Sequence, residues 1–473
     1  MSSAVISGER YRRAFLINLA SSSGASLLRF GVSLALARLL APDQLGLFAI
    51  ANGLVSLIQI PRDAGVSAYL QHVPVLDAGR FRACLGLSLC TTAASIGVLL
   101  AGSGMAASHF AQPDLQPILQ IMCLGLLLSP HDGLMAALAL RDLDAKRMAV
   151  MSRLGSLAYA LTAVGLSLLG WGVQGLAWAY VATAVVCNVV LLLDPPVAAR
   201  GLSWRPAWTG WREPLRFGLG TSAGSLLQTL NGTLPDLLLG RIASPLLVGL
   251  LGRANATVGL FGSLLGPALG FGALPGLAQM HHRGEALAPV LSRAAALITG
   301  LAWPFLALSV WFGRDLLLLL YGPAWLACGP ALLPLALVTA LSLMFGNLGT
   351  ALSAVGRPSL AALLVGLTLL ARLLLLVLCF DGSLASCAWA LAGAAFLVLP
   401  VQLLLSARHL GFGPTALWRA VRGSLALGAC TLGAAALTPW AVLPVWLAAV
   451  FCTGHALRDE ALQLLRLRST IRK

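Results

Sequence analysis

Arg38-Leu39-Leu40-Ala41-Pro42-Asp43-Gln44-Leu45-Gly46-Leu47 is the stretch that decides the fold, because the chain contains a second copy of it. At an offset of 203 residues, the sequence Arg241-Ile242-Ala243-Ser244-Pro245-Leu246-Leu247-Val248-Gly249-Leu250 repeats Arg, Pro, Gly and Leu in register. Each copy separates two long apolar segments, so the chain is expected to consist of two similar halves. Duplicated halves in a hydrophobic chain are typical of transporters, in which a site between two lobes opens to each side in turn.

The composition is that of a membrane protein. Hydrophobic residues make up 59% of the 473 residues and charged residues 10%, far from the values of soluble domains. Apolar runs of about 20 residues, each long enough to cross a bilayer, recur along the chain. We predict an all-α, polytopic membrane protein with about fourteen transmembrane helices. Their expected centres are Ser26, Val55, Ala94, Gly125, Ala160, Ala184, Gln228, Gly262, Leu301, Thr339, Leu369, Ala394, Ala429 and Ala448.

The repeat predicts the domain organisation. The two copies begin six helices apart, so both halves have the same orientation, related by an axis along the membrane normal. We expect an N-terminal lobe of helices one to six at residues 1–200 and a C-terminal lobe of helices seven to twelve at residues 201–410. Residues 411–473 then hold two further helices and a basic tail.

The positive charge predicts the topology. The formal net charge is +15, and most of the Lys and Arg residues fall in alternate loops. Because basic loops stay in the cytoplasm, both termini are expected there, which requires an even number of helices. The charge is spread over many short loops rather than gathered in one patch, so we expect no nucleic-acid partner.

Polar side chains form stripes on the first, second and seventh predicted helices, whereas the eighth carries Arg253 and Asn255 followed by a face of glycines. Spacings of three and four residues place such side chains on one helix face. These stripes predict a polar cavity between helices, although small hydroxyl groups also join helices to one another. The neutral candidates for binding are Asn18, Ser26, Asn52, Ser56, Gln59, Gln228, Asn231 and Asn255.

Charged residues inside the membrane are the second group of candidates. A charge there costs about 3 kcal/mol even on the lenient insertion scale, so it rarely faces lipid. Four arginines (Arg29, Arg62, Arg253 and Arg372) outnumber three carboxylates (Asp63, Asp132 and Asp236). This excess predicts an interior that binds anions, with the carboxylates as counter-ions or ion-coupling groups. Structural ion pairs remain the alternative for each of them, and Arg29 is left open between substrate binding and a structural role.

Two short motifs are not interpreted as catalytic or metal sites. Asp142-Leu143-Asp144 has the D-x-D form of metal-binding glycosyltransferases, but it lies in a short basic loop without alternating strands and helices. His281-His282 lacks further ligands at zinc spacing. We therefore expect no metal, no cofactor and no enzymatic activity, with coupling to a proton or sodium gradient left open.

Several motifs together resemble a known family. Leu36–Leu47, Arg62-Asp63-Ala64-Gly65, Leu140-Arg141-Asp142-Leu143, Asp236–Arg241 and Ala354-Val355-Gly356-Arg357-Pro358 occur in the order found in bacterial Wzx-type polysaccharide flippases. These proteins belong to the multidrug/oligosaccharidyl-lipid/polysaccharide exporter superfamily. The resemblance covers residues 11 to 410.

The resemblance implies a two-lobed fold in the bacterial inner membrane, with a central cavity lined by helices one, two, seven and eight. It also implies a substrate, undecaprenyl-diphosphate carrying an oligosaccharide repeat unit, and a role in making exopolysaccharide, O-antigen or capsule. Membrane lipids, a polysaccharide polymerase and export machinery are the implied partners. Guanidinium groups suit a diphosphate.

We therefore predict an alternating-access flippase. The alternatives are a drug or cation exporter of the same fold, a flippase for the peptidoglycan precursor lipid II and, from another class, a membrane glycosyltransferase or polymerase. A cation exporter would favour an acidic or aromatic cavity, whereas aromatic residues are only 7% here. The enzymes need large outer loops, and the predicted outer loops are short.

Overall fold

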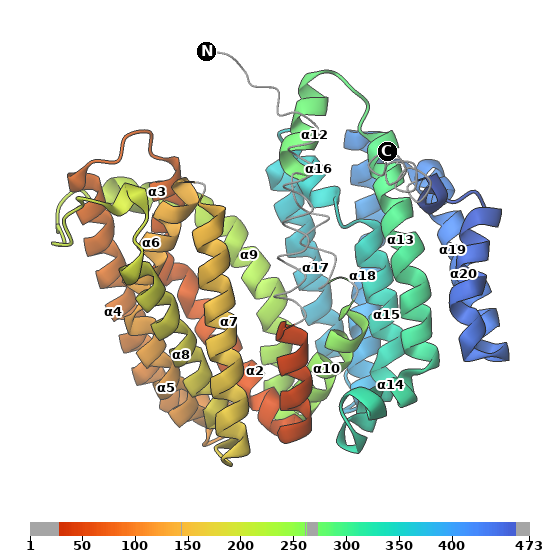
Figure 1. The fold of residues 1–473 in the computed structure, drawn as a ribbon, viewed down its shortest axis with the longest axis horizontal. Helices are drawn as coiled ribbons and strands as arrows, with labels where there is room; N and C mark the ends of the chain where they lie inside the picture. The colour runs from red at the N-terminus through yellow and green to blue at the C-terminus, as the bar shows by residue number, and fades with distance from the viewer. Residues whose placement is uncertain (1–27, 143, 261, 263–272, 460–473) are drawn as a thin grey trace, which may run out of the picture. The chain divides into compact units, whose positions relative to one another are not determined.

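The structure is a computed structural model that describes residues 28–142, 144–260, 262 and 273–459. Within these ranges the chain forms helices and no strands. The described residues belong to two compact units, an N-terminal unit within Ser23–Leu250 and a C-terminal unit within Leu251–Lys473. Each unit is a bundle of long helices (Figure 1). The predicted all-α membrane fold is confirmed, whereas the predicted domain boundaries after residues 200 and 410 stay a prediction.

The N-terminal unit begins with a helical stretch at residues 28–39. Its last helix, α10, continues beyond Leu250 into the C-terminal unit. The remaining elements of this part of the chain are α2 (Pro42–Asp63), α3 (Val66–His72), α4 (Ala78–His109), α5 (Leu115–Leu127), α6 (Ser129–Arg141), α7 (Ala145–Leu168), α8 (Gly172–Leu193), the 3-10 turn η1 (Val197–Ala199), α9 (Arg212–Ile242) and α10 (Pro245–Val258).

The C-terminal unit contains several helices long enough to cross a membrane, joined by short turns (Figure 1). Its elements are α12 (Ala273–His282), α13 (Ala288–Trp311), α14 (Gly313–Leu320), η2 (Pro323–Cys328), α15 (Gly329–Met344), α16 (Leu348–Ala354), α17 (Pro358–Cys379), α18 (Leu384–Leu410), α19 (Pro414–Leu437), η3 (Pro439–Ala441) and α20 (Val442–Cys452).

The number of membrane spans can be compared with the predicted fourteen only in part. Nine described helices are long and apolar enough to cross a membrane, or ten if the bent pair α5 and α6 is one span. The helix α9 is long enough, but its polar stripe leaves it outside that group, and α20 is shorter. Two predicted spans, centred at Ser26 and Gly262, lie largely outside the described residues. The count of fourteen therefore stays a prediction.

The two copies of the repeated motif pack directly on each other within the N-terminal unit. A Cβ atom on Gly46 would overlap the backbone of Pro245, and one on Gly249 would overlap the backbone of Pro42. The same two positions of the repeat thus contact each other reciprocally. Only glycine allows the start of α2 and the start of α10 to approach so closely. The recurrence of Gly in the repeat is therefore explained by this contact.

Helices α2 and α9 lie antiparallel and in close contact along their length. Besides the contact at Gly46, which lies beside the end of α9, Gly53 faces Leu237 at 3.3 Å from its expected Cβ position. At the other end of α2, Gly65 touches the backbone of Gly218. The pairing brings the polar stripes of the second and seventh predicted helices into the same unit.

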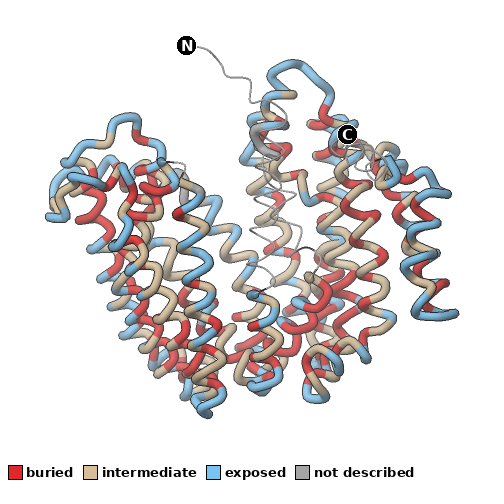
Figure 2. Tube along the Cα trace, in the orientation of Figure 1, coloured by how far each residue is buried: buried red, intermediate tan, exposed pale blue. Residues whose placement is uncertain are grey.

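The cores of both units consist of apolar side chains from neighbouring helices. Buried positions alternate with exposed ones along most helices in Figure 2. Many large apolar side chains stay on the surface, including Leu193 at 81% and Leu437 at 84% exposure. In water such a surface would promote aggregation, but in a bilayer the lipid tails are as apolar as the side chains. The exposed apolar surface is thus that of a membrane protein.

The helix predicted around Gly125 is broken. Helices α5 and α6 meet at an angle of 50°, and Pro130 stands in the first turn of α6. Proline lacks the N–H needed to continue the helical hydrogen bonds, so the chain bends there. The bend places His131 and Asp132 in the first turn of α6, where the free backbone N–H groups of a helix favour a carboxylate.

Candidate functional site

The polar stripe of α2 is present and partly solvent-accessible. Asn52 is exposed, while Ser56 and Gln59 are half-buried. The Ser56 hydroxyl donates to the Asn52 carbonyl oxygen at 2.7 Å, so it is satisfied within its own helix. The Asn52 amide, by contrast, projects from an apolar helix. On the antiparallel partner α9, Gln228 is exposed and Asn231 is half-buried.

Gln59 connects the stripe to a second polar cluster. Its side-chain amide donates to the Tyr180 hydroxyl of α8 at 3.1 Å. The Tyr180 ring fits against α5 because residue 125 is glycine: a Cβ there would lie 2.7 Å from a ring carbon. The polar stripe in the sequence predicted Gln59 as a site residue. It did not predict Tyr180, which lies on another helix, 121 residues further along the chain.

Arg62 and Asp132 are brought together in this second cluster. Asp132 interacts electrostatically first with Arg62 and also with His131. The Arg62 Nε atom is buried and has no hydrogen-bond partner among the described residues. The hydroxyl of Thr91 donates to the Arg62 carbonyl oxygen at 2.6 Å, which fixes the backbone at this point. The two half-buried side chains thus lie close enough to interact through their charges, but they do not form a direct ion pair.

His131 extends the cluster toward α8 and the loop before α9. Its Nδ1 lies 2.7 Å from the side-chain oxygen of Asn188, which is only 5% exposed. The Trp204 ring packs on the imidazole with centroids 5.0 Å apart and on Phe81 at 5.2 Å. Sequence reasoning missed Asn188 and Trp204. A lone Asn within the apolar run around residues 184–192 was the available signal.

Asp63 is placed differently from Asp132. It is the last residue of α2, and its carboxylate accepts a hydrogen bond from the Ser67 hydroxyl at 2.6 Å. The chain breaks directly afterwards, because Ala64 and Gly65 adopt φ values of 44° and 68°. The ion pairs between described residues do not include one of Arg62 with Asp63. Asp63 thus lies at a helix break, held by a hydroxyl.

Arg253 lies in the C-terminal unit between aromatic rings. Its guanidinium carbon is 4.8 Å from the centroid of Tyr321 and 5.0 Å from that of Trp325. Arg253 is 8% exposed, and the Tyr321 hydroxyl is 3.2 Å from that of Thr257. Such cation–π contacts are worth about 2 kcal/mol when desolvated. They hold the arginine at the junction of α10, α14 and η2.

The other predicted site residues are more scattered. Arg29 and Asn255 are exposed, whereas Asp236 and Arg372 are half-buried. Asn18 and Ser26 lie outside the described residues. Of the predicted set, the structure places Arg62 near enough to Asp132 for their charges to interact and bonds Gln59 to Tyr180. Binding by any of these residues stays a prediction.

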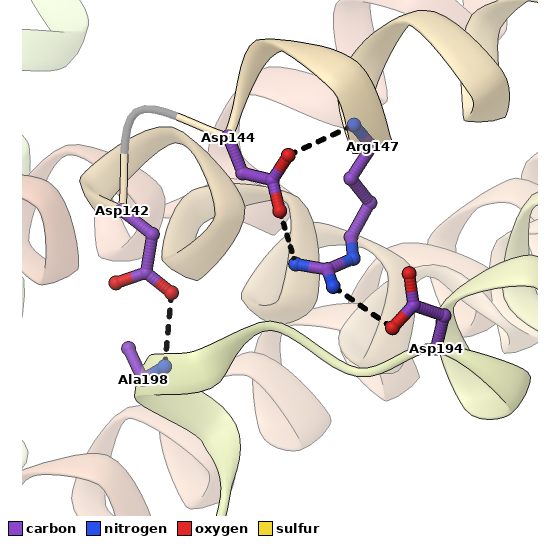
Figure 3. Close-up of polar contacts among 5 residues, drawn as sticks. All are labelled: Asp142, Asp144, Arg147, Asp194 and Ala198. Carbon is purple, nitrogen blue, oxygen red and sulfur yellow. Dashed lines mark hydrogen bonds and ion pairs between the residues drawn. The ribbon is translucent and has the colours of Figure 1, made fainter.

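The D-x-D motif has a structural role (Figure 3). The Asp142 carboxylate accepts from the Ala198 backbone N–H at 2.9 Å. Asp144 pairs with Arg147 at 2.6 Å, and Arg147 reaches Asp194 at 2.9 Å. The side chain of Arg147 is 8% exposed. Both carboxylates of the motif therefore hold the loop between α6 and α7 against the end of α8.

Helices of this length and apolarity, paired around polar faces, define a multi-pass membrane transporter fold. In a comparison with solved structures, the chain aligns with "Lipid II flippase MurJ, inward closed conformation" at a TM-score of 0.74 and 9% identity, over 94% of this chain and 100% of that one. An outward-facing multidrug resistance MATE family transporter of the MOP superfamily aligns at a TM-score of 0.54 and 14% identity, covering 84% and 95%. At these identities, the likeness concerns the fold alone.

The sequence itself gives the family. Residues 35–330, more than half of the chain, match the model of a family described as polysaccharide biosynthesis protein. The chain belongs to this polysaccharide biosynthesis protein family. The resemblance to polysaccharide flippases of the exporter superfamily is thereby confirmed. No curated protein sequence matches the chain.

Proposed function

We propose that this protein moves undecaprenyl-diphosphate-linked oligosaccharides from the cytoplasmic to the periplasmic leaflet of the inner membrane by alternating access. The observation that carries the proposal is the pair of polar faces on the adjacent helices α2 and α9, on which Asn52 and Gln228 are exposed. Amides on a membrane-spanning helix are unfavourable toward lipid. They are suited to a water-filled path for a headgroup.

The chemistry of the exposed groups fits a glycan carried on a diphosphate. Amide side chains both donate and accept hydrogen bonds, as the hydroxyl groups of a sugar require. Arg29, exposed on the first helical stretch, supplies a guanidinium that binds phosphate oxygens in pairs. The polyprenyl tail would stay in the bilayer while the polar headgroup passes through the protein.

We further infer that the Arg62–Asp132 cluster couples this movement to a proton gradient. Asp132 interacts through its charge with Arg62 and with the neighbouring imidazole of His131, so the charges of these groups depend on one another. Of the three carboxylates predicted for coupling, Asp132 has a cation and an imidazole as neighbours, whereas Asp63 is held by Ser67.

Lipid II is the second candidate substrate. The alignment with the lipid II flippase at a TM-score of 0.74 favours it over the multidrug transporters, which align at 0.54 and 0.51. Both lipid-linked candidates share a polyprenyl diphosphate and differ in the headgroup. A glycosyltransferase or polymerase has no comparable support from the fold or the family.

The proposal can be tested with purified protein in liposomes containing an undecaprenyl-diphosphate oligosaccharide labelled with NBD on the sugar. Externally added dithionite bleaches only the outer leaflet, so flipping exposes the remaining label. Asn52→Ala and Gln228→Ala should each slow the initial rate by about tenfold, the effect of about 1.4 kcal/mol in the barrier.

The matched control is Gln116→Ala, which removes an exposed amide from α5 outside the two polar faces and should keep the wild-type rate. Equal rates for the wild type and both α2 and α9 variants would contradict the proposed path. The same liposomes with labelled lipid II, or with a fluorescent cationic drug, decide between the candidate substrates. Bleaching no faster than in protein-free liposomes for every lipid would refute the flippase function.

A further inference from the structure

The segment after α20 returns into the C-terminal unit through one histidine. His455 is 5% exposed, whereas Thr453 and Gly454 before it are exposed. The imidazole lies between α13 and α19 because both helices carry glycine at the contact. A Cβ atom on Gly300 would overlap the ring, and one on Gly423 would lie 2.9 Å from a ring carbon.

A series of hydrogen bonds runs through the ring in one direction. The Leu457 backbone N–H donates to His455 Nδ1 at 3.2 Å, so the ring proton must be on Nε2. Nε2 lies 3.1 Å from the Ser424 hydroxyl, which in turn is 2.8 Å from that of Thr299. Thr299 donates to the Ala295 carbonyl oxygen at 2.7 Å. Every donor in this chain has its acceptor, so a second ring proton would face the Leu457 N–H.

The surroundings offer no compensation for a positive charge on this imidazole. In the described part of the chain, burial alone shifts the pKa of His455, and it lowers the pKa below the ordinary value. On the two helices that pack against the ring, and in the segment itself, every Arg and Asp side chain is exposed. They are Arg293 on α13, Arg419 and Arg422 on α19, and Arg458 and Asp459 in the segment itself.

We propose that His455 is a pH-sensitive latch, which docks the segment after α20 onto α13 and α19 while it is neutral and releases it when protonated. The latch is independent of the proposed substrate, because it involves none of the residues assigned to the polar faces. It would let pH control how firmly α20 and the helical turn that follows it are held to the C-terminal unit.

The sign of the pH effect follows from proton linkage. A free histidine has a pKa of about 6.5, and docking lowers the pKa, so the docked form binds fewer protons. Docking is therefore complete above about pH 6.5 and weakens as the pH falls, by up to tenfold per pH unit. The backbone N–H groups of Leu457 and Arg458, which bond to His455, should report the change directly.

Hydrogen–deuterium exchange on the purified, full-length protein in nanodiscs tests the latch. Exchange is followed in peptides containing residues 453–459 at pH 5.5 and 7.5, and each rate is divided by the intrinsic rate at that pH. We expect protection to fall by about tenfold at pH 5.5. In His455→Gln, which cannot titrate, protection should be the same at both values.

Two glycine variants keep the test decisive if the Gln variant docks poorly. Gly300→Ala places a methyl group in the ring's position and should remove protection at both pH values. Gly428→Ala, on α19 where a Cβ meets open space, should keep the wild-type response. Equal protection of the wild-type segment at both pH values would overturn the proposal, and so would an unchanged pH response in His455→Gln or Gly300→Ala.

Discussion

The cluster around Arg62 and Asp132 shows what individual residues of the sequence do and do not reveal. Arg62, Gln59 and Asp132 stand out in the sequence as polar groups in apolar helices. Tyr180 does not stand out, because it reaches Gln59 from another helix, beside a glycine at position 125. The bend at Pro130, which sets the position of His131 and Asp132, does not stand out either. Contacts between distant helices depend on packing that no local pattern encodes.

Asp132→Asn tests the coupling proposal at this scale. Asparagine keeps the size of the side chain but cannot exchange a proton. A pH difference of one unit supplies about 1.4 kcal/mol per proton, so the wild type should concentrate labelled substrate in one leaflet by up to tenfold. The variant should equilibrate the leaflets without a gradient response, as measured by dithionite bleaching under an imposed pH difference.

Asp63→Asn is the matched control for this experiment. Its carboxylate bonds to Ser67 at the end of α2, so its loss should leave the response to the gradient intact. Protein abundance must be measured for both variants, because Arg62 loses a counter-charge in Asp132→Asn and buried unpaired cations are destabilising. A normally folded Asp132→Asn protein that still accumulates substrate would show that coupling lies elsewhere.

Arg253 is a similar case with a different lesson. Its position inside an apolar stretch of the sequence predicts a cationic group that faces a cavity. In the structure it is enclosed between Tyr321 and Trp325. Both rings come from a segment more than sixty residues later. Aromatic rings can hold a buried arginine in place without a carboxylate partner. Substrate binding by Arg253 stays a prediction.

At the scale of elements, the helices themselves were predictable. Twelve of the expected centres fall in described helices, from Val55 in α2 to Ala448 in α20, because long apolar runs bounded by Pro, Gly and charged residues leave few alternatives. The break between α5 and α6 and the end of α2 at Asp63 were not predicted in place. Pro61 stands inside α2, and the helix continues through it to Asp63, three residues before α3 begins at Val66.

The reciprocal contact of α2 with α10 gives a prediction at this scale. In Gly249→Ala, the new methyl group overlaps the Pro42 carbonyl region. Overpacking of this kind costs about 1–3 kcal/mol, so thermal unfolding in detergent should begin at a lower temperature. Gly252→Ala, three residues further along α10, meets open space and should be neutral or slightly stabilising, because alanine favours helices.

Both variants replace a glycine of α10 with alanine, so a general effect of losing glycine would change the stability of both by the same amount. Equal melting temperatures for Gly249→Ala and the wild type would show that α2 and α10 do not need the close approach. A selective loss would explain why the repeat contains glycine at both positions 46 and 249, rather than simply two copies of a turn.

At the scale of the whole molecule, the contacts bear on the predicted topology through the N-terminal unit. In the N-terminal unit, Arg141 donates to the Leu70 carbonyl oxygen and Arg82 to that of Arg205. These bonds, with that of Asp142 to Ala198, bring the basic loops before α4, α7 and α9 to one end of the unit. At its other end, Gln44 lies beside Gly172, and the side chain of Ile50 beside Gly240.

Gathering the basic loops at one end predicts which side of the membrane that end faces. Basic loops are retained in the cytoplasm, so a reporter inserted after Trp208, in the basic loop before α9, should read as cytoplasmic. An insertion after Ser108, at the end of α4 away from that loop, should read as periplasmic. Paired fluorescent-protein and alkaline-phosphatase insertions measure both. Phosphatase activity at Trp208 would mean that the unit has the opposite orientation in the membrane, and the proposed direction of transport would then be reversed. A fusion after Lys473 extends the test to the C-terminus, where a cytoplasmic signal is expected because an even number of spans returns the chain to its starting side.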